Sequence, residues 1–581
     1  MALNSSQVSS SWLRQFGTAL ESRDVSAIAS CCHPKVYFRD ILVFSWDNRC
    51  LHGHSILAAY LTRAFAKESQ PSITRVELDK SRPGLLPEYG PLTNKLPLRA
   101  VSAAFKFSCA VGVGRGYFSL VYTESRQWKA LVVMMALADI KGHEEIERPL
   151  AQHHEGDERR AIETNPHVLI IGGGQSGLVV AARFKQMNIR ALVLETNHRV
   201  GDNWRKRHPS LVLHSPKKCN SMLYRPFPNS WPDFISRDQF ADWLEQYVLD
   251  LDLVVWTNSR PLPRPTYDPT SKRWTVEVDR AGEHLVLNPV HIVVAAGTLG
   301  APRVPYIPSQ HNFTGTTMHS SEYRDGKSFS GKRVVVVGAG NTSSDLCQDL
   351  VLHGAQSVTM VQRSSTWITS RASAREMFEC MYPSELDIDV CDLLAMARPL
   401  KLMQKIEKQT MAQTLKEERA THRGLREVGF HLETEKTFLS LWYERLGGID
   451  NGCAELIRSG KVKIKQGVEI LQFSGASSIG FTDGTSLEVD SVIYATSHES
   501  VTDTMRPLFG EKIIAMAGPV WGTDGEGELR GCYRPTGHPG LWFAAGELAV
   551  SRPCSKQLVS EANSRLLILI SFLVGIANQG D

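Results

Sequence analysis

Short apolar runs recur along the chain between residues 165 and 565. Val168–Ile171, Ala191–Leu194, 334–337 and 492–495 carry no charge and show no alternation of polar and apolar positions. Such runs are typical of strands that are buried on both faces of a parallel sheet. Segments of helix length separate them, so this part of the chain predicts an α/β architecture.

The first 140 residues follow a different pattern. Amphipathic stretches at 12–29 and 53–65 predict helices, and 36–46 predicts a pair of strands. Strand-like runs follow at 100–109, 115–123 and 128–136. Helices followed by a meander of antiparallel strands predict a separate α+β cone with a central cavity.

Residues 46–61, WDNRCLHGHSILAAYL, give this first region a resemblance to the SnoaL/NTF2-like fold. That fold binds small molecules in some families and mediates association in others, so the resemblance implies either a ligand cavity or a homodimer. Asp40, His52 and His54 are the polar candidates for lining the cavity. The plainer interpretation of each is a surface or hydrogen-bonded side chain.

Composition narrows the class of protein. A chain of 581 residues is long enough for about three domains. Its net charge of +4 is too small over this length to indicate nucleic-acid binding. The eleven cysteines contain no CxxC pair, which argues against a disulfide framework and against a metal site built on cysteines. With no secretory signal in the N-terminal residues, we expect a cytoplasmic protein.

A glycine-rich turn follows the first apolar run. Gly172, Gly174 and Gly177 are spaced as GxGxxG, with Gln175 inside the turn and a helix-like segment after it. The next apolar run ends at Glu195. In a strand–turn–helix unit these glycines give a tight turn, close approach of a pyrophosphate and close helix packing, and the terminal acid binds ribose hydroxyls. Further along the chain, Trp204 with the proline-rich segment 226–232 predicts a loop around a flat ligand, and Gly546 ends the last strand beside it.

A second turn of the same kind begins at Gly338. Gly338, Gly340 and Ser343 form GxGxxS, and the following strand ends in Gln362-Arg363-Ser364-Ser365 instead of an acid. Arginine with serines suits a ribose 2′-phosphate, whereas an acid suits free hydroxyls. The first site is therefore predicted to bind FAD and the second NADPH. Arg363 could instead be an ordinary surface charge.

Two such sites on one chain predict hydride transfer from NADPH to a flavin. A disulfide reductase would need a CxxC pair beside the flavin, and the chain has none. Two kinds of enzyme are compatible with these residues: a flavin reductase or oxidase that yields peroxide, and a monooxygenase. A binding protein with a degenerate flavin site is a third alternative.

Residues 313–323, FTGTTMHSSEY, match FxGxxxHxxxY. This motif and the segments around 201–216, 231–247 and 358–367 resemble class B flavin-dependent monooxygenases, most closely their YUCCA-type, indole-3-pyruvate monooxygenase-like branch. The resemblance covers about residues 165–565. It implies that NADPH reduces FAD, that O₂ adds to give a C4a-hydroperoxyflavin, and that one oxygen atom passes to a small organic substrate. Epoxidation, hydroxylation and oxidative decarboxylation, in a secondary-metabolite pathway, are the implied outcomes.

The resemblance also assigns residues. His214 stands where flavin-containing monooxygenases have an active-site Asn, and we name His214 and Asn341 as catalytic candidates. His319 of the motif is expected at the hinge and the NADPH contact, or in a structural link between domains. Ala495-Thr496-Ser497 replaces the usual ATG, and that change puts close packing at this strand end in doubt.

These patterns predict the following domain boundaries: an NTF2-like domain at 1–140, a charged linker at 141–165, an FAD domain at 166–325 and 465–565, an NADPH domain at 326–464 with a helical insertion at 371–445, and a C-terminal helix at 566–581. The apolar segment 566–577 is too short to span a bilayer as a helix. It predicts a buried helix or a peripheral membrane contact.

Overall fold

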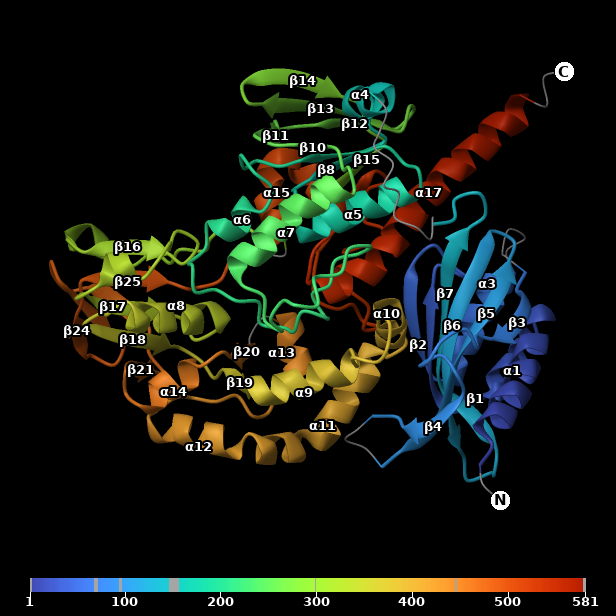
Figure 1. The fold of residues 1–581 in the computed structure, drawn as a ribbon, viewed down its shortest axis with the longest axis horizontal. Helices are drawn as coiled ribbons and strands as arrows, with labels where there is room; N and C mark the ends of the chain where they lie inside the picture. The colour runs from blue at the N-terminus through green and yellow to red at the C-terminus, as the bar shows by residue number, and fades with distance from the viewer. Residues whose placement is uncertain are drawn as a thin grey trace.

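The computed structural model describes residues 3–66, 72–93, 97–145, 156–297, 299–444 and 447–577, and the side chains of all of these except 442–444, 447 and 563–577. Three bodies lie side by side (Figure 1). A mostly antiparallel sheet with its helices is at the right, one α/β unit is at the top, and a second α/β unit is at the left. A group of helices late in the chain runs along the bottom and reaches the N-terminal body.

The N-terminal body is a seven-stranded sheet in the order β2-β1-β7-β6-β5-β3, with β4 paired to β5. Its elements are α1 (Ser5–Glu21), α2 (Val25–Cys31), β1 (Cys32–Ile41), β2 (Asn48–His52), α3 (His54–Phe65), β3 (Thr74–Leu78), β4 (Glu88–Pro91), β5 (Arg99–Cys109), β6 (Gly112–Tyr122) and β7 (Trp128–Ile140). The single helix predicted at 12–29 is two helices. The first ends at Glu21, and Asp24 caps the second by accepting a hydrogen bond from Ala27 N at 2.9 Å.

Aromatic side chains fill the space between this sheet and α1–α3, where the sequence predicted a cavity. Trp12 stacks on Phe16 at 4.8 Å and lies 4.5 Å from Phe118. Asp40 is fully buried beside them and accepts hydrogen bonds from Val43 N and from the Tyr60 hydroxyl. Burial raises the pKa of Asp40 to about 6.

The two histidines are also engaged by the protein itself. His52 Nδ1 lies 3.2 Å from Val36 O, and His54 Nε2 lies 3.1 Å from Cys32 O. Their polar atoms bond to main-chain carbonyls of the same domain, so the plainer interpretation holds for Asp40, His52 and His54.

The other face of this sheet is covered by the same chain. Helix α10 (Ile388–Met396) and its C-cap supply Val390, Leu393 and Ala397, which pack with a cluster of sheet residues: Ile41, Leu42, Ala104, Met134, Ala136, Leu137 and Ile140. Helix α11 (Leu400–Glu417) supplies Leu402 and Ile406, which pack with other residues of the sheet. Arg39 of β1 forms a two-point ion pair with Glu528, at 2.6 Å for both contacts, and also donates to Met396 O. A homodimer through the N-terminal domain could therefore not use this covered part of the sheet.

The first α/β unit contains a five-stranded parallel sheet in the order β10-β9-β8-β15-β26. Its elements are β8 (Val168–Ile171), α5 (Gln175–Gln186), β9 (Ala191–Leu194), α6 (Asp202–Arg205), α7 (Arg237–Asp250), β10 (Val255–Trp256), β15 (His291–Val294), α15 (Val501–Phe509), α16 (Glu511–Ala517) and β26 (Leu541–Phe543). An antiparallel excursion lies beside it and comprises β11 (Ser259–Pro261), β12 (Thr266–Asp268), β13 (Arg273–Arg280) and β14 (Glu283–Leu287). The parallel strands are buried throughout, as their apolar runs predicted.

The second α/β unit has a parallel sheet in the order β16-β25-β17-β18-β21. Its elements are η1 (Gln310–Asn312), β16 (Thr316–His319), η2 (Lys327–Phe329), β17 (Arg333–Val337), α8 (Asn341–Leu352), β18 (Ser357–Gln362), α14 (Cys453–Arg458), β21 (Val462–Gln466), β22 (Ile470–Phe473), β23 (Ser478–Phe481), β24 (Ser486–Glu488) and β25 (Ser491–Tyr494).

The boundaries predicted for the two α/β domains, 326 and 465, are wrong for two strands. β16 and β25 pair with each other, and β25 also pairs with β17, so both strands belong to the second sheet. Apolar runs alone do not say which sheet a strand joins, because strands of both sheets have the same composition.

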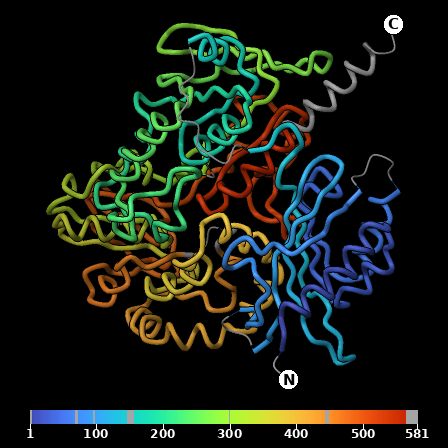
Figure 2. The backbone as a smooth tube through the Cα atoms, turned by 45° about the vertical axis from the view of Figure 1, so that its right-hand side comes forward, coloured from blue at the N-terminus to red at the C-terminus, as the bar shows by residue number. Residues whose placement is uncertain are grey.

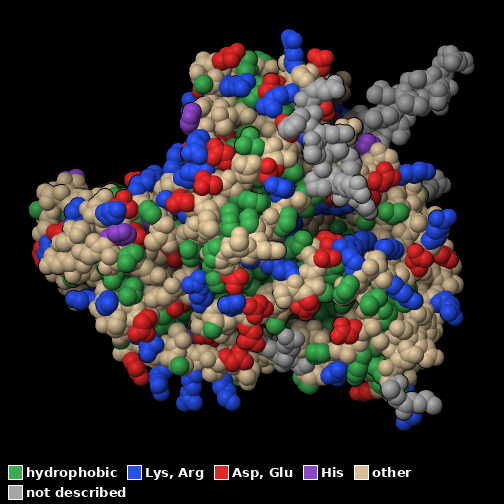
Figure 3. All heavy atoms as spheres, in the orientation of Figure 1, with side chains coloured by type: hydrophobic (Ala, Val, Ile, Leu, Met, Phe, Trp, Pro, Cys, Tyr) green, Lys and Arg blue, Asp and Glu red, His purple; other side chains and the backbone are tan. Residues whose placement is uncertain are grey.

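The region predicted as a helical insertion, 371–445, forms α9 (Arg371–Met381), α10, α11, α12 (Arg419–Glu427) and α13 (Phe438–Glu444). Short strands β19 (Trp367–Ser370) and β20 (Gly447–Asp450) pair at its base. α12 buries His422 and Leu425 and turns Arg419, Arg423 and Arg426 to solvent, where basic side chains project at the lower edge of the molecule (Figure 3).

The C-terminal helix begins earlier than predicted. α17 runs Leu548–Ala577 and packs on α5 and α10. The side chains of 566–577, for which the sequence predicts a buried helix or a peripheral membrane contact, lie outside the described residues. In the part of the chain that the structure describes, no helix is long and apolar enough to cross a membrane.

The predicted linker contains a helix, α4 (Gly156–Thr164), and a partly buried carboxylate. Glu145 bonds to Arg183 of α5 and to Lys556 of α17, the latter at 2.7 Å. Burial acts to raise the pKa of Glu145, but the two cations outweigh it and lower the pKa to about 2. The segment after β7 is thus tied to the first α/β unit, and the backbone view shows that unit beside the N-terminal body (Figure 2).

Candidate functional site

The first glycine turn lies at the carboxyl edge of the first parallel sheet, between β8 and α5. Gly172 has φ +112°, and a Cβ there would come within 2.6 Å of Ala295 O. A Cβ on Gly177 would lie 2.0 Å from Gly172 O. Gly174 differs, because the nearest atom to its Cβ position is Asn203 Nδ2 at 3.6 Å. Two glycines are therefore required by packing, and the third leaves the start of α5 open in front.

The other residues predicted for the first site gather at this helix start. Glu195 is 6% exposed and accepts hydrogen bonds from Gly173 N at 2.9 Å and from Asn197 N at 2.8 Å. Trp204 Nε1 donates to Gln175 Oε1 at 3.4 Å.

Gly546 follows β26, which is two strands from β8 in the same sheet, and it also lies at the start of α5. Its φ is +118°, and Ser176 Oγ of α5 donates to its carbonyl oxygen at 3.3 Å. Residues predicted from segments almost 400 positions apart thus meet at one edge of one sheet, which is the usual position of a ligand in open α/β sheets.

The second turn has the same backbone form. Gly338 has φ +125°, and its Cβ would lie 2.5 Å from Ala495 O. Gly340 caps α8 with no other atom within 4 Å of its Cβ position among the described residues. Ser343 is 1% exposed and packs against Gly338, so serine fits the third position of the motif.

Arg363 lies at the expected edge but is not held there. It follows β18, which pairs with β17 in register, so it is on the same side of the sheet as Gly338. Its side chain is 76% exposed and forms an ion pair with Glu469, itself exposed, at 3.1 Å. A surface pair of this kind is worth about 0–1 kcal/mol, which leaves the guanidinium free to exchange partners.

Both turns fit an adenine dinucleotide. Each presents the unbonded N–H groups and the positive dipole end of a helix to an open space that a pyrophosphate can enter. At the first turn, the buried Glu195 carboxylate is next to that space. At the second, the exposed guanidinium of Arg363 follows the neighbouring strand.

Both catalytic candidates are found at helix α8: His214 contacts the helix, and Asn341 is part of it. His214 comes from the first unit, and its Nε2 lies 3.0 Å from Asp345 Oδ2 on α8. Asn341, the first residue of α8, accepts a hydrogen bond from Ile449 N at 2.9 Å and so ties β20 to the helix. Part of the hydrogen-bonding capacity of Asn341 is therefore used in local structure.

The FxGxxxHxxxY motif joins the two units. His319 is 1% exposed; its Nε2 lies 3.1 Å from Ser497 O and its Nδ1 lies 2.9 Å from Ser321 Oγ. Tyr323 donates to Asp349 Oδ2 at 2.7 Å, and Ser210 of the first unit donates to Asp349 Oδ1 at 2.6 Å. The motif therefore reaches the junction between the units through Tyr323 and Asp349, whereas His319 bonds to residues of the second unit, and both alternatives for His319 stay predictions.

Sequence reasoning missed two acids of this junction, Asp345 and Asp349. They lie four residues apart on α8, which places them on one face of the helix. A pair of acids at this spacing, on the helix that follows a glycine turn, was the available signal. It could not reveal the partners, because His214 and Ser210 are more than 130 positions away.

A second missed pair ties α17 to α10. Arg552 is 1% exposed and forms a two-point pair with Asp392 at 2.8 and 2.9 Å. It also donates to the carbonyl oxygens of Cys219 and Ser221, a few residues after His214. A buried arginine with four hydrogen bonds to three residues fixes this loop against the helices.

Comparison with known proteins gives the family. The model of the flavin-binding monooxygenase-like family matches residues 165–517. The chain belongs to this family. It is therefore a flavin-dependent monooxygenase in kind, as predicted, and residues 1–164 lie before the matched region.

Relatives with assigned names agree with the family. The chain is 32% identical over 340 residues to indole-3-pyruvate monooxygenase YUCCA1 of Oryza sativa subsp. japonica, covering 58% of this chain and 77% of that protein. It is 31% identical over 359 residues to the probable indole-3-pyruvate monooxygenase YUCCA9 of Arabidopsis thaliana, covering 61% and 80%.

A solved structure agrees with the fold. An oxidized steroid monooxygenase bound to NADP aligns with a TM-score of 0.52 and 18% identity, over 69% of this chain and 85% of that one. This likeness confirms the α/β fold with two Rossmann-like units.

Proposed function

We propose that this enzyme binds FAD at the first glycine turn and NADPH at the second, and uses O₂ to oxygenate a small organic substrate. The observation that supports this most strongly is the pair of dinucleotide edges on one chain, joined through helix α8. The helix whose N-terminus would hold NADPH is bonded through Asp345 and Asp349 to the segment 206–214 of the first unit. The flavin, when bound, accepts a hydride from NADPH and activates O₂.

The residues of the chain have separate roles in this proposal. Glu195 binds the ribose of the flavin dinucleotide, and Arg363 exchanges Glu469 for the 2′-phosphate of NADPH. Tyr323 and Asp349 are buried where the units meet, with Ser210 at the exposed rim, and they exclude water from the inner part of this contact. Exclusion of water matters because a wet site favours loss of peroxide over transfer of oxygen to substrate.

His214 is the polar side chain that we place at the substrate, with Asp345 as its positioning residue. A carboxylate can only accept from the ring, so Asp345 holds the proton on Nε2 and leaves Nδ1 as the acceptor. A fixed tautomer lets the ring accept one defined hydrogen bond. Asp345 comes from the NADPH unit, so the pair is assembled only when the two units are in contact.

The relatives suggest a substrate class. Both are named for indole-3-pyruvate, a 2-oxo acid, and we propose that this enzyme acts on a small organic acid or ketone by oxidative decarboxylation, hydroxylation or epoxidation. The alternative is an NADPH oxidase that releases peroxide.

An oxygen balance separates the monooxygenase from the oxidase. Purified enzyme is supplied with NADPH, isotope-labelled O₂ and a panel of 2-oxo acids, and the label is measured in product and in peroxide. We expect one labelled atom in an organic product and a fall in peroxide yield when a substrate is present. Asp345→Asn should raise the peroxide yield and change its pH profile while flavin content stays the same. Stoichiometric peroxide with every substrate would favour the oxidase instead.

A further inference from the structure

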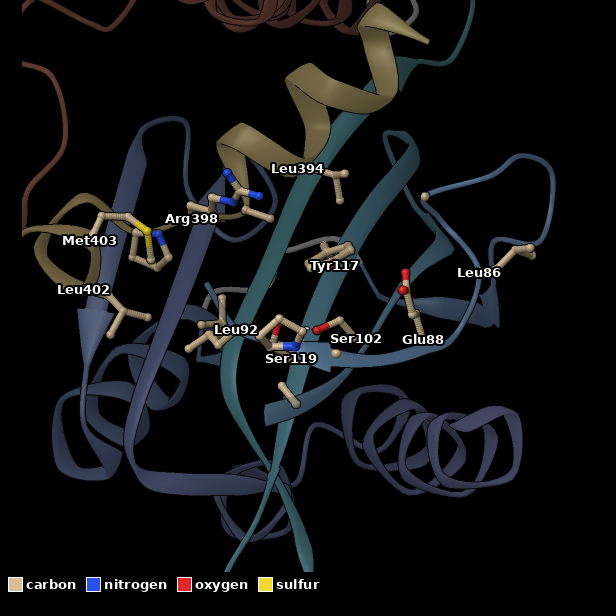
Figure 4. A pocket seen from close by; sticks show the side chains of 17 residues that line it. Leu86, Glu88, Leu92, Ser102, Tyr117, Ser119, Leu394, Arg398, Leu402 and Met403 are labelled. Carbon is tan, nitrogen blue, oxygen red and sulfur yellow. Dashed lines mark hydrogen bonds between the residues drawn. The ribbon is translucent and has the colours of Figure 1, made fainter. Parts of the chain in front are cut away.

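A cavity of about 250 Å³ lies between the N-terminal sheet and the helices that cover it (Figure 4). One wall is the covered face of β4, β5, β6 and β7, and the other is the end of α10 and the start of α11. No residue of either glycine turn lines it. It is therefore separate from the dinucleotide sites described above.

The floor of the cavity carries three hydroxyl groups on an otherwise apolar face. Ser102 and Ser119 are cross-strand partners whose Oγ atoms lie 2.8 Å apart. Tyr117, two residues before Ser119 on β6, points to the same side. Burying a hydroxyl costs about 1–3 kcal/mol unless it is hydrogen-bonded, so serines on a packed sheet face are costly without a polar partner. One bond between two hydroxyls leaves acceptor sites on both.

Opposite charges flank the cavity. Arg398, at the end of α10, and Glu88, on β4, lie on opposite sides of Tyr117 (Figure 4), and both are exposed. Burial raises the pKa of Tyr117 above its ordinary value, and the hydroxyl forms a side-chain hydrogen bond with Ser102, so the three hydroxyl groups make one polar cluster. A guanidinium is always charged and weakly hydrated, and it suits a carboxylate that reaches it from the cavity.

The remaining walls are apolar. Leu92 and Val132 face the cavity from the sheet, and Leu394, Leu402 and Met403 face it from the helices. Typical ligand pockets measure about 300–1,000 Å³, so a cavity slightly below that range suits a molecule of about ten non-hydrogen atoms. An apolar ring with a polar group at each end would match the walls, the floor and the rim.

We propose that this cavity is an accessory binding site for a small aromatic carboxylic acid. The carboxylate pairs with Arg398, the ring lies between the leucines of the two walls, and a hydroxyl or N–H group reaches Ser102 and Ser119. The ligand would bridge the N-terminal domain and the helical insertion. The proposal does not depend on the proposed reaction, because it uses no residue of the flavin or NADPH sites.

Calorimetric titration of the flavin-loaded, full-length enzyme tests the site with two probes, 4-hydroxybenzoate and the neutral 4-hydroxybenzamide. We expect the acid to bind at least tenfold more tightly than the amide. Arg398→Gln should reduce acid binding to the level of the amide, and Ser119→Ala should weaken both probes about three- to tenfold. Arg423→Gln, an exposed arginine of α12 outside the cavity, is the matched control and should change nothing.

Several outcomes would overturn the proposal. They are the absence of binding by the acid, equal binding of acid and amide, or acid binding that Arg398→Gln leaves unchanged. The last result would mean that the acid binds elsewhere, the substrate site included. NADPH oxidation and flavin content, measured on the same samples, report on the proposed function separately from this site.

Discussion

The two glycine turns have the same backbone form, but they differ in how firmly the neighbouring polar side chain is held. At the first edge, Glu195 is buried and fixed by hydrogen bonds from Gly173 N and Asn197 N. At the second edge, Arg363 is 76% exposed and has one exposed partner, Glu469. A preorganised site loses little entropy on binding, whereas a mobile side chain must be ordered by its ligand. With the two edges assigned as we propose, we expect FAD to be a resident cofactor and NADPH to come and go.

The strand ends of the two sheets differ in the same sense. Gly297 closes β15 in the first unit with φ +92°, and Ser497 follows β25 in the second with φ +73°. A left-handed conformation is free for glycine and costs other residues about 1–2 kcal/mol. At this position the second edge therefore stores strain that the glycine of the first edge avoids, and His319 bonds to the carbonyl oxygen of Ser497.

The largest effect is expected from Gly177→Ala. The new Cβ would lie 2.0 Å from Gly172 O, and both atoms belong to backbone that cannot move aside. We expect a loss of about 3 kcal/mol or more in stability and no bound flavin after purification. Gly525→Ala, at a position with open space around the Cβ, is the control and should keep its flavin. A yellow, stable Gly177→Ala variant would remove the packing argument for the first edge.

The second largest effect is expected from Glu195→Gln. The amide keeps one acceptor but turns an N–H group toward the donors of Gly173 or Asn197, and the charge is lost. A charge-assisted hydrogen bond is worth about 1.5–3 kcal/mol, so the Kd for FAD should rise about 10- to 100-fold. Equilibrium dialysis of FAD measures this, with the exposed Glu277→Gln as the matched change. An unchanged Kd would mean that Glu195 has only a structural role.

Arg363→Ala should affect the second edge alone. We expect KM for NADPH to rise about tenfold and KM for NADH to stay constant, since only NADPH carries the 2′-phosphate. Steady-state oxidation of both nucleotides measures the split, and flavin content should not change. Arg458→Ala, an exposed arginine of α14 in the same unit, is the control. Parallel changes for NADPH and NADH would argue against contact with the 2′-phosphate.

The smallest effect is expected from Ser497→Gly. Removing the left-handed strain should stabilise the protein by about 0.5–1 kcal/mol after the greater entropy of glycine in the unfolded chain is allowed for. Thermal unfolding measures it, with Ser384→Gly at an exposed turn position as the comparison. A destabilised Ser497→Gly variant would show that the serine side chain makes a contact of its own.

The sequence predicted the local parts of this molecule better than their assembly. Gly172, Gly177 and Gly338 have the close backbone contacts that the glycine motifs predict, because a turn, a strand and a helix within thirty residues dictate them. The strand at 492–495 was found but given to the wrong sheet. Its pairing depends on β17, more than 150 residues earlier, and nothing in its own composition encodes that partner.

The site followed the same rule. Glu195 and Arg363 were found because each stands at the end of the strand that follows its glycine motif in the sequence. Asp345 and Asp349 were missed because their roles appear only when helix α8 meets the segment 206–214. The covered face of the N-terminal sheet was likewise invisible in sequence, since the helices that cover it lie 250 residues later in the chain.

The most direct test of the central claim is an anaerobic titration of the purified enzyme with NADPH, followed by flavin absorbance. We predict that each chain holds one tightly bound FAD. One equivalent of NADPH should bleach it fully, and NADH should bleach it much more slowly. A protein that holds no flavin even after reconstitution, or whose flavin NADPH leaves oxidized, would contradict it.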